Sequence, residues 1–119
     1  MKKILILDDK EAIAKILSMY LGKENEIIWF DNPQKGIVWL DQGNLPDLII
    51  SDLNMPYMSG EEFLKYIKAN EKYKDIKVII LSSNDSTTEK IRLLEIGAND
   101  YVIKPFNPVE LNVRVKKLL

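Results

Sequence analysis

The sequence contains no cysteine and no histidine. Without cysteine the chain cannot form disulfides or use a thiolate nucleophile, and without both residue types it lacks the usual ligands of a zinc finger. Without histidine there is no imidazole to act as a general acid or base near neutral pH. Any catalytic or metal-binding chemistry must therefore depend on carboxylates, hydroxyls, amides and ammonium groups.

Long apolar runs and an excess of one charge are also missing. Two aspartates stop the apolar run in the N-terminal MKKILILDD, so it is too short for a signal peptide, and no stretch approaches the roughly 18 residues of a membrane span. The 17 basic and 18 acidic residues give a net charge of −1, so no bulk positive field attracts nucleic acid or anionic lipid. We therefore expect a cytoplasmic domain that binds neither nucleic acid nor membranes.

The remaining composition is that of an ordinary globular domain. The 119 residues are 46% hydrophobic and 29% charged. A chain of this length supports one domain with one core, and it shows neither a linker nor an internal repeat. We expect residues 1–119 to form a single domain.

Short apolar runs alternate with longer amphipathic segments, which indicates five strand–helix units. The expected strands are Lys3–Leu7, Glu26–Phe30, Leu48–Ser51, Lys77–Leu81 and Tyr101–Ile103. Strands so rich in isoleucine, leucine and valine predict a parallel sheet with helices on both faces. Because five units are too few for a closed barrel of eight, we expect an α/β fold with an open, doubly wound sheet. The alternation alone leaves the strand order open.

Local signals predict where the helices begin and end. Helical spacing of apolar residues, with Gly22 as a stop, predicts a first helix that uses Ile13, Ile16, Leu17, Tyr20 and Leu21. Four capping signals predict the starts of the other helices, namely Asn32-Pro33, Ser59 with Glu62, Ser86 with Glu89, and Asn107-Pro108.

Side chains suited to chemistry follow four of the five expected strands. They are Asp8 and Asp9 after the first, Asp52 after the third, Ser82 after the fourth and Lys104 after the fifth. Taken singly, each is an ordinary turn, cap or surface residue. In an open α/β sheet, however, ligands bind outside the carboxyl ends of the strands. We therefore expect three carboxylates, a hydroxyl and an ammonium to converge on one rim.

Such a cluster suits phosphoryl transfer. Three neighbouring carboxylates repel one another unless a cation relieves them, and oxygen ligands without imidazole or thiolate suit Mg²⁺. Together with an ammonium and a hydroxyl they form a cradle for a phosphoryl group, whose transfer needs mainly placement and charge neutralisation. The pattern predicts that Asp52 is a nucleophile that becomes an aspartyl phosphate.

In this combination the sequence resembles a response-regulator receiver domain of two-component signalling. The resemblance spans essentially the whole chain and rests on four ordered segments, which are ILILDD, DLIISDLNMPYMSG, VIILSS and GANDYVIKPF. It implies a flavodoxin-like (βα)5 fold with strand order 2-1-3-4-5. A chain without histidine cannot be its own phosphohistidine donor, so a separate kinase or a small phosphodonor must supply the phosphoryl group. The resemblance implies a sensor histidine kinase as this partner.

The resemblance implies roles for the residues at the rim. Asp9, Asp52 and the backbone carbonyl of Asn54 would bind Mg²⁺ directly, and Asp8 would bind it through water.

On the other side of the pocket, Lys104 would contact the phosphoryl oxygens. Ser82 would swing towards the phosphate and Tyr101 would turn inward into the space vacated, while simple packing is the alternative for Tyr101. Family members usually have a cis peptide before the proline that matches Pro105.

The resemblance further implies a signalling switch rather than an enzyme, one that promotes only its own phosphorylation and dephosphorylation. The output would be controlled through the last two units, for example as transcription through a winged-helix domain that this chain does not contain. Val109 and Val113 lie opposite the core stripe of the final helix, and charged residues accompany them, namely Lys90, Asp100, Glu110 and Arg114. This set resembles the dimerisation face of receivers that precede winged-helix domains, and a merely solvated helix face is the alternative.

Two other functions are open at this point. An aspartate-nucleophile phosphatase also uses a strand-end aspartate and Mg²⁺, but it needs an acid two residues further on, where this chain has Asn54. An unphosphorylated receiver-like interaction module is disfavoured because all the acidic, hydroxyl and lysine positions are filled.

Overall fold

A computed structural model describes all 119 residues. Five parallel strands form one sheet in the order β2-β1-β3-β4-β5, which confirms the predicted α/β fold and the strand order that the resemblance implied. The strands are β1 (Lys2–Leu7), β2 (Asn25–Phe30), β3 (Leu48–Asp52), β4 (Lys77–Ser82) and β5 (Asp100–Ile103). Each differs from its predicted range by at most one residue at either end.

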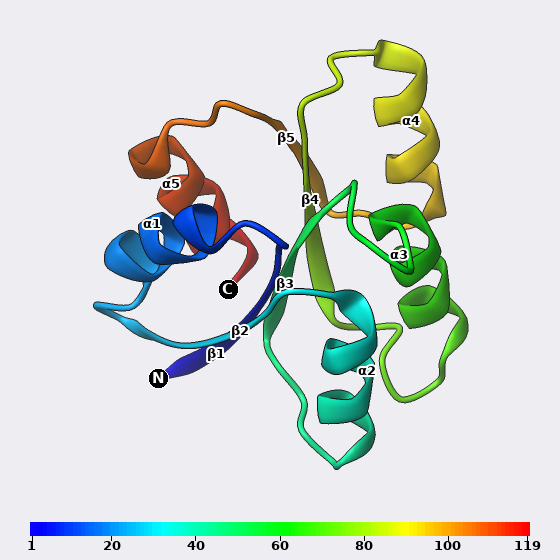
Figure 1. The fold of residues 1–119 in the computed structure, drawn as a ribbon, viewed down its shortest axis with the longest axis horizontal. Helices are drawn as coiled ribbons and strands as arrows, with labels where there is room; N and C mark the ends of the chain where they lie inside the picture. The colour runs from blue at the N-terminus through cyan, green and yellow to red at the C-terminus, as the bar shows by residue number, and fades with distance from the viewer.

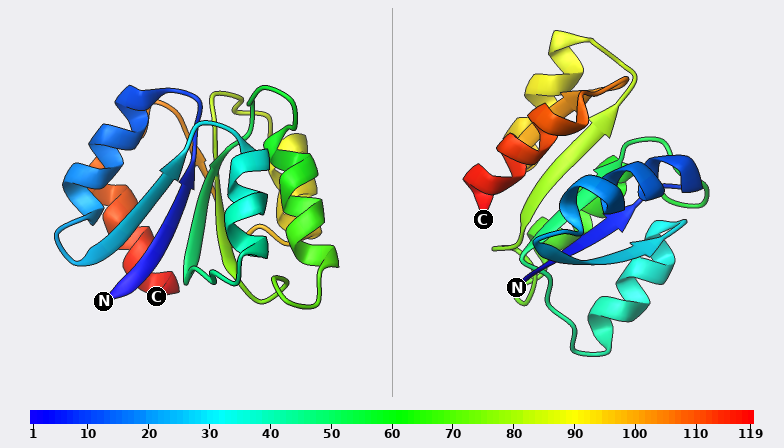
Figure 2. Two further views of the ribbon diagram at one scale, coloured as in Figure 1. Left: turned by 60° about the horizontal axis from the view of Figure 1, so that its bottom comes forward. Right: turned by 90° about the vertical axis from the view of Figure 1, so that its left-hand side faces the viewer.

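The five helices lie on both faces of the sheet. They are α1 (Glu11–Leu21), α2 (Pro33–Asp41), α3 (Gly60–Ala69), α4 (Thr87–Ile96) and α5 (Pro108–Leu118). Helices α1 and α5 cover one face, and α2, α3 and α4 cover the other (Figure 1). Figure 2 shows the sheet on edge between these two layers.

Two apolar clusters hold the layers together. Because side chains alternate along a strand, Ile4 and Ile6 of β1 pack with α1 and α5, whereas Leu5 and Leu7 pack with α2, α3 and α4. All four are fully buried, and burial of each such side chain contributes about 1.5–3 kcal/mol. The strand ends are therefore held on a rigid frame.

Three of the four predicted helix starts form as the sequence indicates. Asn32 and Asn107 each stand before a proline, and their side chains accept hydrogen bonds from backbone N–H groups in the first turn of the helix. Ser59 makes a complete capping box with Glu62. The prediction of a capping box for Ser86 and Glu89 was half wrong. The Ser86 hydroxyl accepts from the Glu89 N–H, but the Glu89 carboxylate bonds elsewhere, as described below.

The first helix buries a narrower stripe than its apolar pattern suggests. Leu17 and Leu21 are buried together with Ala14, but Ile16 and Tyr20 are 38% and 39% exposed. Successive helical positions are about 100° apart, so residues one position before Leu17 and Leu21 lie at the side of the helix. The prediction that Ile16 and Tyr20 belong to the packing stripe was wrong in this respect.

Candidate functional site

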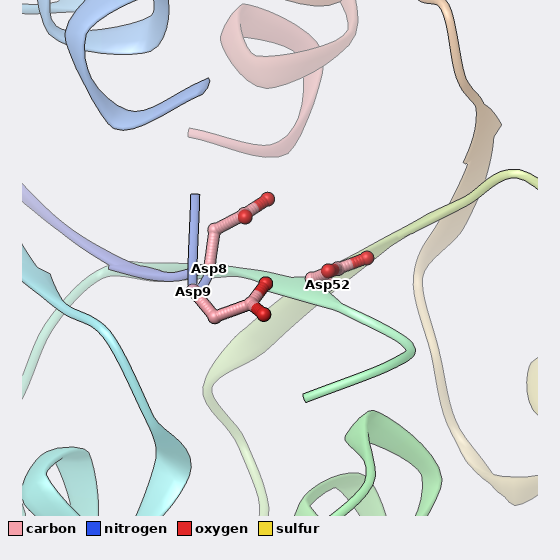
Figure 3. A group of neighbouring side chains, drawn as sticks. All are labelled: Asp8, Asp9 and Asp52. Atoms are coloured by element: carbon pink, nitrogen blue, oxygen red, sulfur yellow. The ribbon is translucent and has the colours of Figure 1, made fainter. Parts of the chain in front are cut away.

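The neighbouring ends of β1 and β3 bring three aspartates together. Leu7 pairs with Ser51 in the sheet, so the residues that follow in each strand lie at the same edge. Carboxylate oxygens of Asp8, Asp9 and Asp52 lie within 4.8 Å of one another, and Figure 3 shows the three side chains at the ends of β1 and β3. Asp52 is itself the last residue of β3 and pairs with Leu81 of β4, one residue beyond the predicted strand end.

Lys104 joins this acidic cluster from the end of β5. Its ammonium lies 3.2 Å from Asp8 Oδ2 and 3.1 Å from Asp52 Oδ1. The residues Asp8 and Asp52 are 0% and 4% exposed, whereas Asp9 is exposed. Three ionised carboxylates and one ammonium leave a net charge of −2 in a cluster of which only Asp9 is exposed, and this charge favours binding of a further cation.

Burial has a direct effect on the protonation of Asp8. It raises the pKa of the Asp8 carboxyl above its usual value, because desolvation penalises the charged form. The Lys10 N–H, which donates to Asp8 Oδ1 at 2.9 Å, and the Lys104 ammonium act in the opposite direction. The charged form of the Asp8 carboxyl is therefore stabilised by the Lys10 N–H and by the Lys104 ammonium.

Ser82 lies at the same edge of the sheet. It is the last residue of β4 and is fully buried, and its carbonyl accepts a hydrogen bond from the Lys104 N–H at 2.7 Å. Its hydroxyl accepts from the Asn84 N–H at 3.0 Å. The Lys104–Pro105 peptide is cis, which is the form that the resemblance implied and the residues alone left open. The structure thus places the hydroxyl, the ammonium and the carboxylates at the ends of neighbouring strands.

Comparison with known proteins identifies the family. The family model of the response regulator receiver domain matches residues 4–116. The chain belongs to this family. Among solved structures, this receiver domain superposes on a putative response regulator from Chloroflexus aurantiacus with a TM-score of 0.91 and 31% identity, covering 98% of this chain and 96% of the other. The chemotaxis response regulator CheY4 of Vibrio cholerae gives the same TM-score and identity, covering 100% of this chain and 99% of the other.

Two relatives are named as regulatory proteins. The regulatory protein VanR of Enterococcus faecium is 36% identical over 98% of this chain and 49% of its own length. The phosphate regulon transcriptional regulatory protein PhoB of Pseudomonas aeruginosa is 38% identical over 99% of this chain and 52% of its own length. The receiver domain therefore spans about half the length of these relatives.

Tyr101 of the receiver domain points into the molecule. It is 3% exposed. Its hydroxyl lies within donating distance of two acceptors, the Asn84 carbonyl at 2.6 Å and Glu89 Oε1 at 2.9 Å. Burial raises the pKa of Tyr101, and the Glu89 carboxylate raises it further. The sequence predicts a capping role for Glu89, three residues after Ser86, and carries no signal of its hydrogen bond with Tyr101.

The oxygen donors fit the Mg²⁺ that the sequence predicts. Asp8, Asp9 and Asp52 offer hard carboxylate oxygens within reach of one ion, and Lys104 compensates only part of their charge. Asn54 lies in the exposed loop that follows β3, two residues beyond Asp52.

The predicted dimerisation residues lie on the face formed by α4, β5 and α5. Val109 and Val113 are 61% and 50% exposed, as predicted. Arg114 donates to Asp100 at 2.9 Å and to Glu110 at 3.1 Å within the same chain. These ion pairs are intramolecular in this structure.

No helix of the receiver domain has the length and hydrophobicity to cross a bilayer.

Proposed function

We propose that the domain, taken as residues 1–119, accepts a phosphoryl group on Asp52 in a Mg²⁺-dependent reaction and so controls an output. The observation that carries the proposal is the contact of Lys104 with both Asp52 and Asp8 in a cluster of three carboxylates. In phosphoryl transfer the protein supplies mainly position and opposite charge. The cluster offers a carboxylate nucleophile on a rigid strand with an ammonium beside it.

In the proposed reaction, a carboxylate oxygen of Asp52 attacks the phosphorus atom of the donor. The new bond is Asp52 O–P, and the bond from phosphorus to the donor's nitrogen or oxygen breaks, with its electron pair leaving on the donor. Lys104 neutralises charge on the phosphoryl oxygens. Asp9, Asp52 and the Asn54 carbonyl would hold Mg²⁺ directly and Asp8 through water, and the ion would supply further charge neutralisation.

A sensor histidine kinase is the proposed protein donor. The chain has no histidine, so the phosphohistidine cannot come from this domain itself. A histidine kinase of Formosa agariphila, named P4, contains a segment 38% identical to this chain, which spans 8% of that protein. The proposed site of action is the cytoplasm. PhoB and VanR are named as regulators, which supports an output in transcription through a further domain, with no nucleic-acid binding by the receiver itself.

Ser82 and Tyr101 are the proposed switch. Binding of the Ser82 hydroxyl to the phosphoryl group would stabilise the inward Tyr101 and the matching arrangement of α4 and β5, which is a shift of population between two states. Tyr101 already lies inward in this structure, bonded to the Asn84 carbonyl and to Glu89, so phosphorylation would stabilise an arrangement that the unphosphorylated chain can adopt. The domain promotes its own phosphorylation and dephosphorylation only.

The test uses a small phosphodonor, which requires no kinase. Incubation with acetyl phosphate and Mg²⁺ is expected to add one phosphoryl group, measured by intact mass and released by hydroxylamine, with none added in EDTA. Asp52→Asn is expected to remove the labelling, because an amide is a poor nucleophile. Labelling that persists in this variant would move the phosphoacceptor elsewhere, and no labelling of the wild type would favour the unphosphorylated interaction module. Turnover of other phosphate esters would favour a phosphatase. We do not expect it, because a phosphatase needs an acid at the position that Asn54 occupies.

We further propose that phosphorylated domains pair through α4, β5 and α5, using Lys90, Asp100, Glu110 and Arg114. Arg114→Ala is expected to weaken phosphorylation-linked dimerisation about tenfold, because charged residues at such interfaces fix register and partner. Sedimentation equilibrium with and without acetyl phosphate measures the change, and Lys117→Ala on the same helix is the control. A wild-type domain that stays monomeric in both states would contradict the dimer.

A further inference from the structure

Trp29 of β2 reaches the acidic turn from the neighbouring strand. In the sheet register it lies opposite Ile6 of β1, two residues before Asp8. Its ring is half-buried against the apolar cluster under α1 and α5. Its indole Nε1–H donates a hydrogen bond of 2.8 Å to the backbone carbonyl of Asp8. The side chain therefore joins the core to the first residue of the acidic turn.

The peptide that joins Asp8 to Asp9 contains this carbonyl. Next to it, the Asp8 N–H donates to the Phe30 carbonyl at 3.3 Å, so β2 holds the Asp8 backbone on both sides. The Asp8 side chain is held separately, by the Lys10 N–H and by Lys104. Orientation of this peptide is therefore determined from β2 rather than by the carboxylates.

Asp9 depends most on that peptide. Its side chain is exposed and makes no hydrogen bond or ion pair with the rest of the chain, in contrast to Asp8 and Asp52. The backbone is therefore all that holds the Asp9 carboxylate near the other two. A rotation of the Asp8–Asp9 peptide would move one carboxylate of the cluster and leave the other two in place.

We propose that Trp29 is a positioning residue for the divalent cation: its indole N–H fixes the Asp8–Asp9 peptide and thereby sets the affinity of the acidic cluster for Mg²⁺. This inference rests on the proposed metal site. An indole suits the task because its ring packs in the core while its single N–H needs an acceptor. Phenylalanine would fill much of the same space without the donor.

The test compares the two tryptophans of the chain. Loss of one hydrogen bond in Trp29→Phe is expected to weaken Mg²⁺ binding about three- to tenfold, measured by NMR titration of backbone amide shifts at Asp9 and Leu53. Trp39→Phe is the matched control, because Trp39 packs against Phe30 on the opposite face of the sheet. We expect its Mg²⁺ affinity to equal that of the wild type.

The outcomes separate this inference from the function on which it rests. If Trp29→Phe melts at a lower temperature but binds Mg²⁺ as tightly as the wild type, Trp29 only packs and the inference is overturned while the metal site stands. If the wild type binds no Mg²⁺, both are overturned.

A second measurement does not depend on the fold of the Trp29 variant. In Trp39→Phe, Trp29 is the only indole, and its emission is expected to change with Mg²⁺ at the same midpoint as the Asp9 amide shift. Emission that stays constant while the amide titrates would contradict a link between the indole and the metal site.

Discussion

Lys104→Ala is expected to lower the free energy of unfolding of the metal-free domain by about 3–5 kcal/mol, the usual cost of leaving buried charges without their partner. The Lys104 ammonium lies within 3.2 Å of both Asp8 and Asp52, and both carboxylates are almost inaccessible to water. Chemical denaturation in EDTA measures the loss. Addition of Mg²⁺ is expected to restore part of it, because the ion replaces the missing positive charge and binds only the folded state.

A surface ion pair of the same length provides the control. Lys35 and Asp31 lie 3.0 Å apart, but their side chains are 58% and 50% exposed. Lys35→Ala is therefore expected to cost about 0–1 kcal/mol, with no dependence on Mg²⁺. Equal losses for the two variants in EDTA would contradict the view that Lys104 compensates buried charge.

In Mg²⁺ we expect Lys104→Ala to fold and bind the ion, yet fail to change conformation on phosphorylation.

Gly60→Ala is the second substitution with a large expected effect. A Cβ atom at this position would lie 2.3 Å from the Asp52 carbonyl oxygen and 2.8 Å from the Leu53 Cα. Both are backbone atoms, so either α3 or the end of β3 must shift. Overpacking of this kind costs about 1–3 kcal/mol, and a displaced nucleophile can slow a reaction about 100-fold. We expect a loss of this order in the rate of labelling by acetyl phosphate.

Gly36→Ala is the matched control for this steric argument. Its Cβ would approach the end of the Leu7 side chain at 2.9 Å, which can rotate away, and alanine favours the helix by about 1 kcal/mol. We expect near-wild-type stability and an unchanged labelling rate. A Gly60→Ala variant labelled as fast as Gly36→Ala would show that the carbonyl of Asp52 tolerates displacement.

Features that depend on nearby residues were predicted well from the sequence. The caps at Asn32, Ser59 and Asn107 require only a few neighbouring residues, and each forms as predicted. Apolar runs located every strand. In β1, β3 and β4 nearly every residue is buried, because both faces of a parallel sheet are covered. The edge strands β2 and β5 are only partly buried. Strand ends then indicated which side chains could meet, and the structure brings Asp8, Asp9, Asp52 and Lys104 together.

Features that depend on tertiary contacts were not predicted. The alternation of strands and helices does not determine strand order, which came from the family resemblance. Glu89 bonds to Tyr101, twelve positions away, and Trp29 bonds to Asp8, twenty-one positions away. Neither pair has a local pattern, because the contacts exist only after β5 and β2 take their places in the sheet. The exposure of Ile16 and Tyr20 in α1 was not predicted, because the spacing of apolar residues does not reveal how wide a face of the helix the sheet covers.

The acidic cluster is expected to hold a metal ion, with a phosphoryl group between Asp52 and Lys104. Crystals grown with Mn²⁺ and beryllofluoride, a phosphoryl analogue, test it directly, because the anomalous signal of manganese locates the ion. We expect the manganese peak among Asp8, Asp9 and Asp52, and the analogue on the Asp52 carboxylate in contact with Lys104. An ion elsewhere, or an analogue bound to a residue other than Asp52, would contradict the claim.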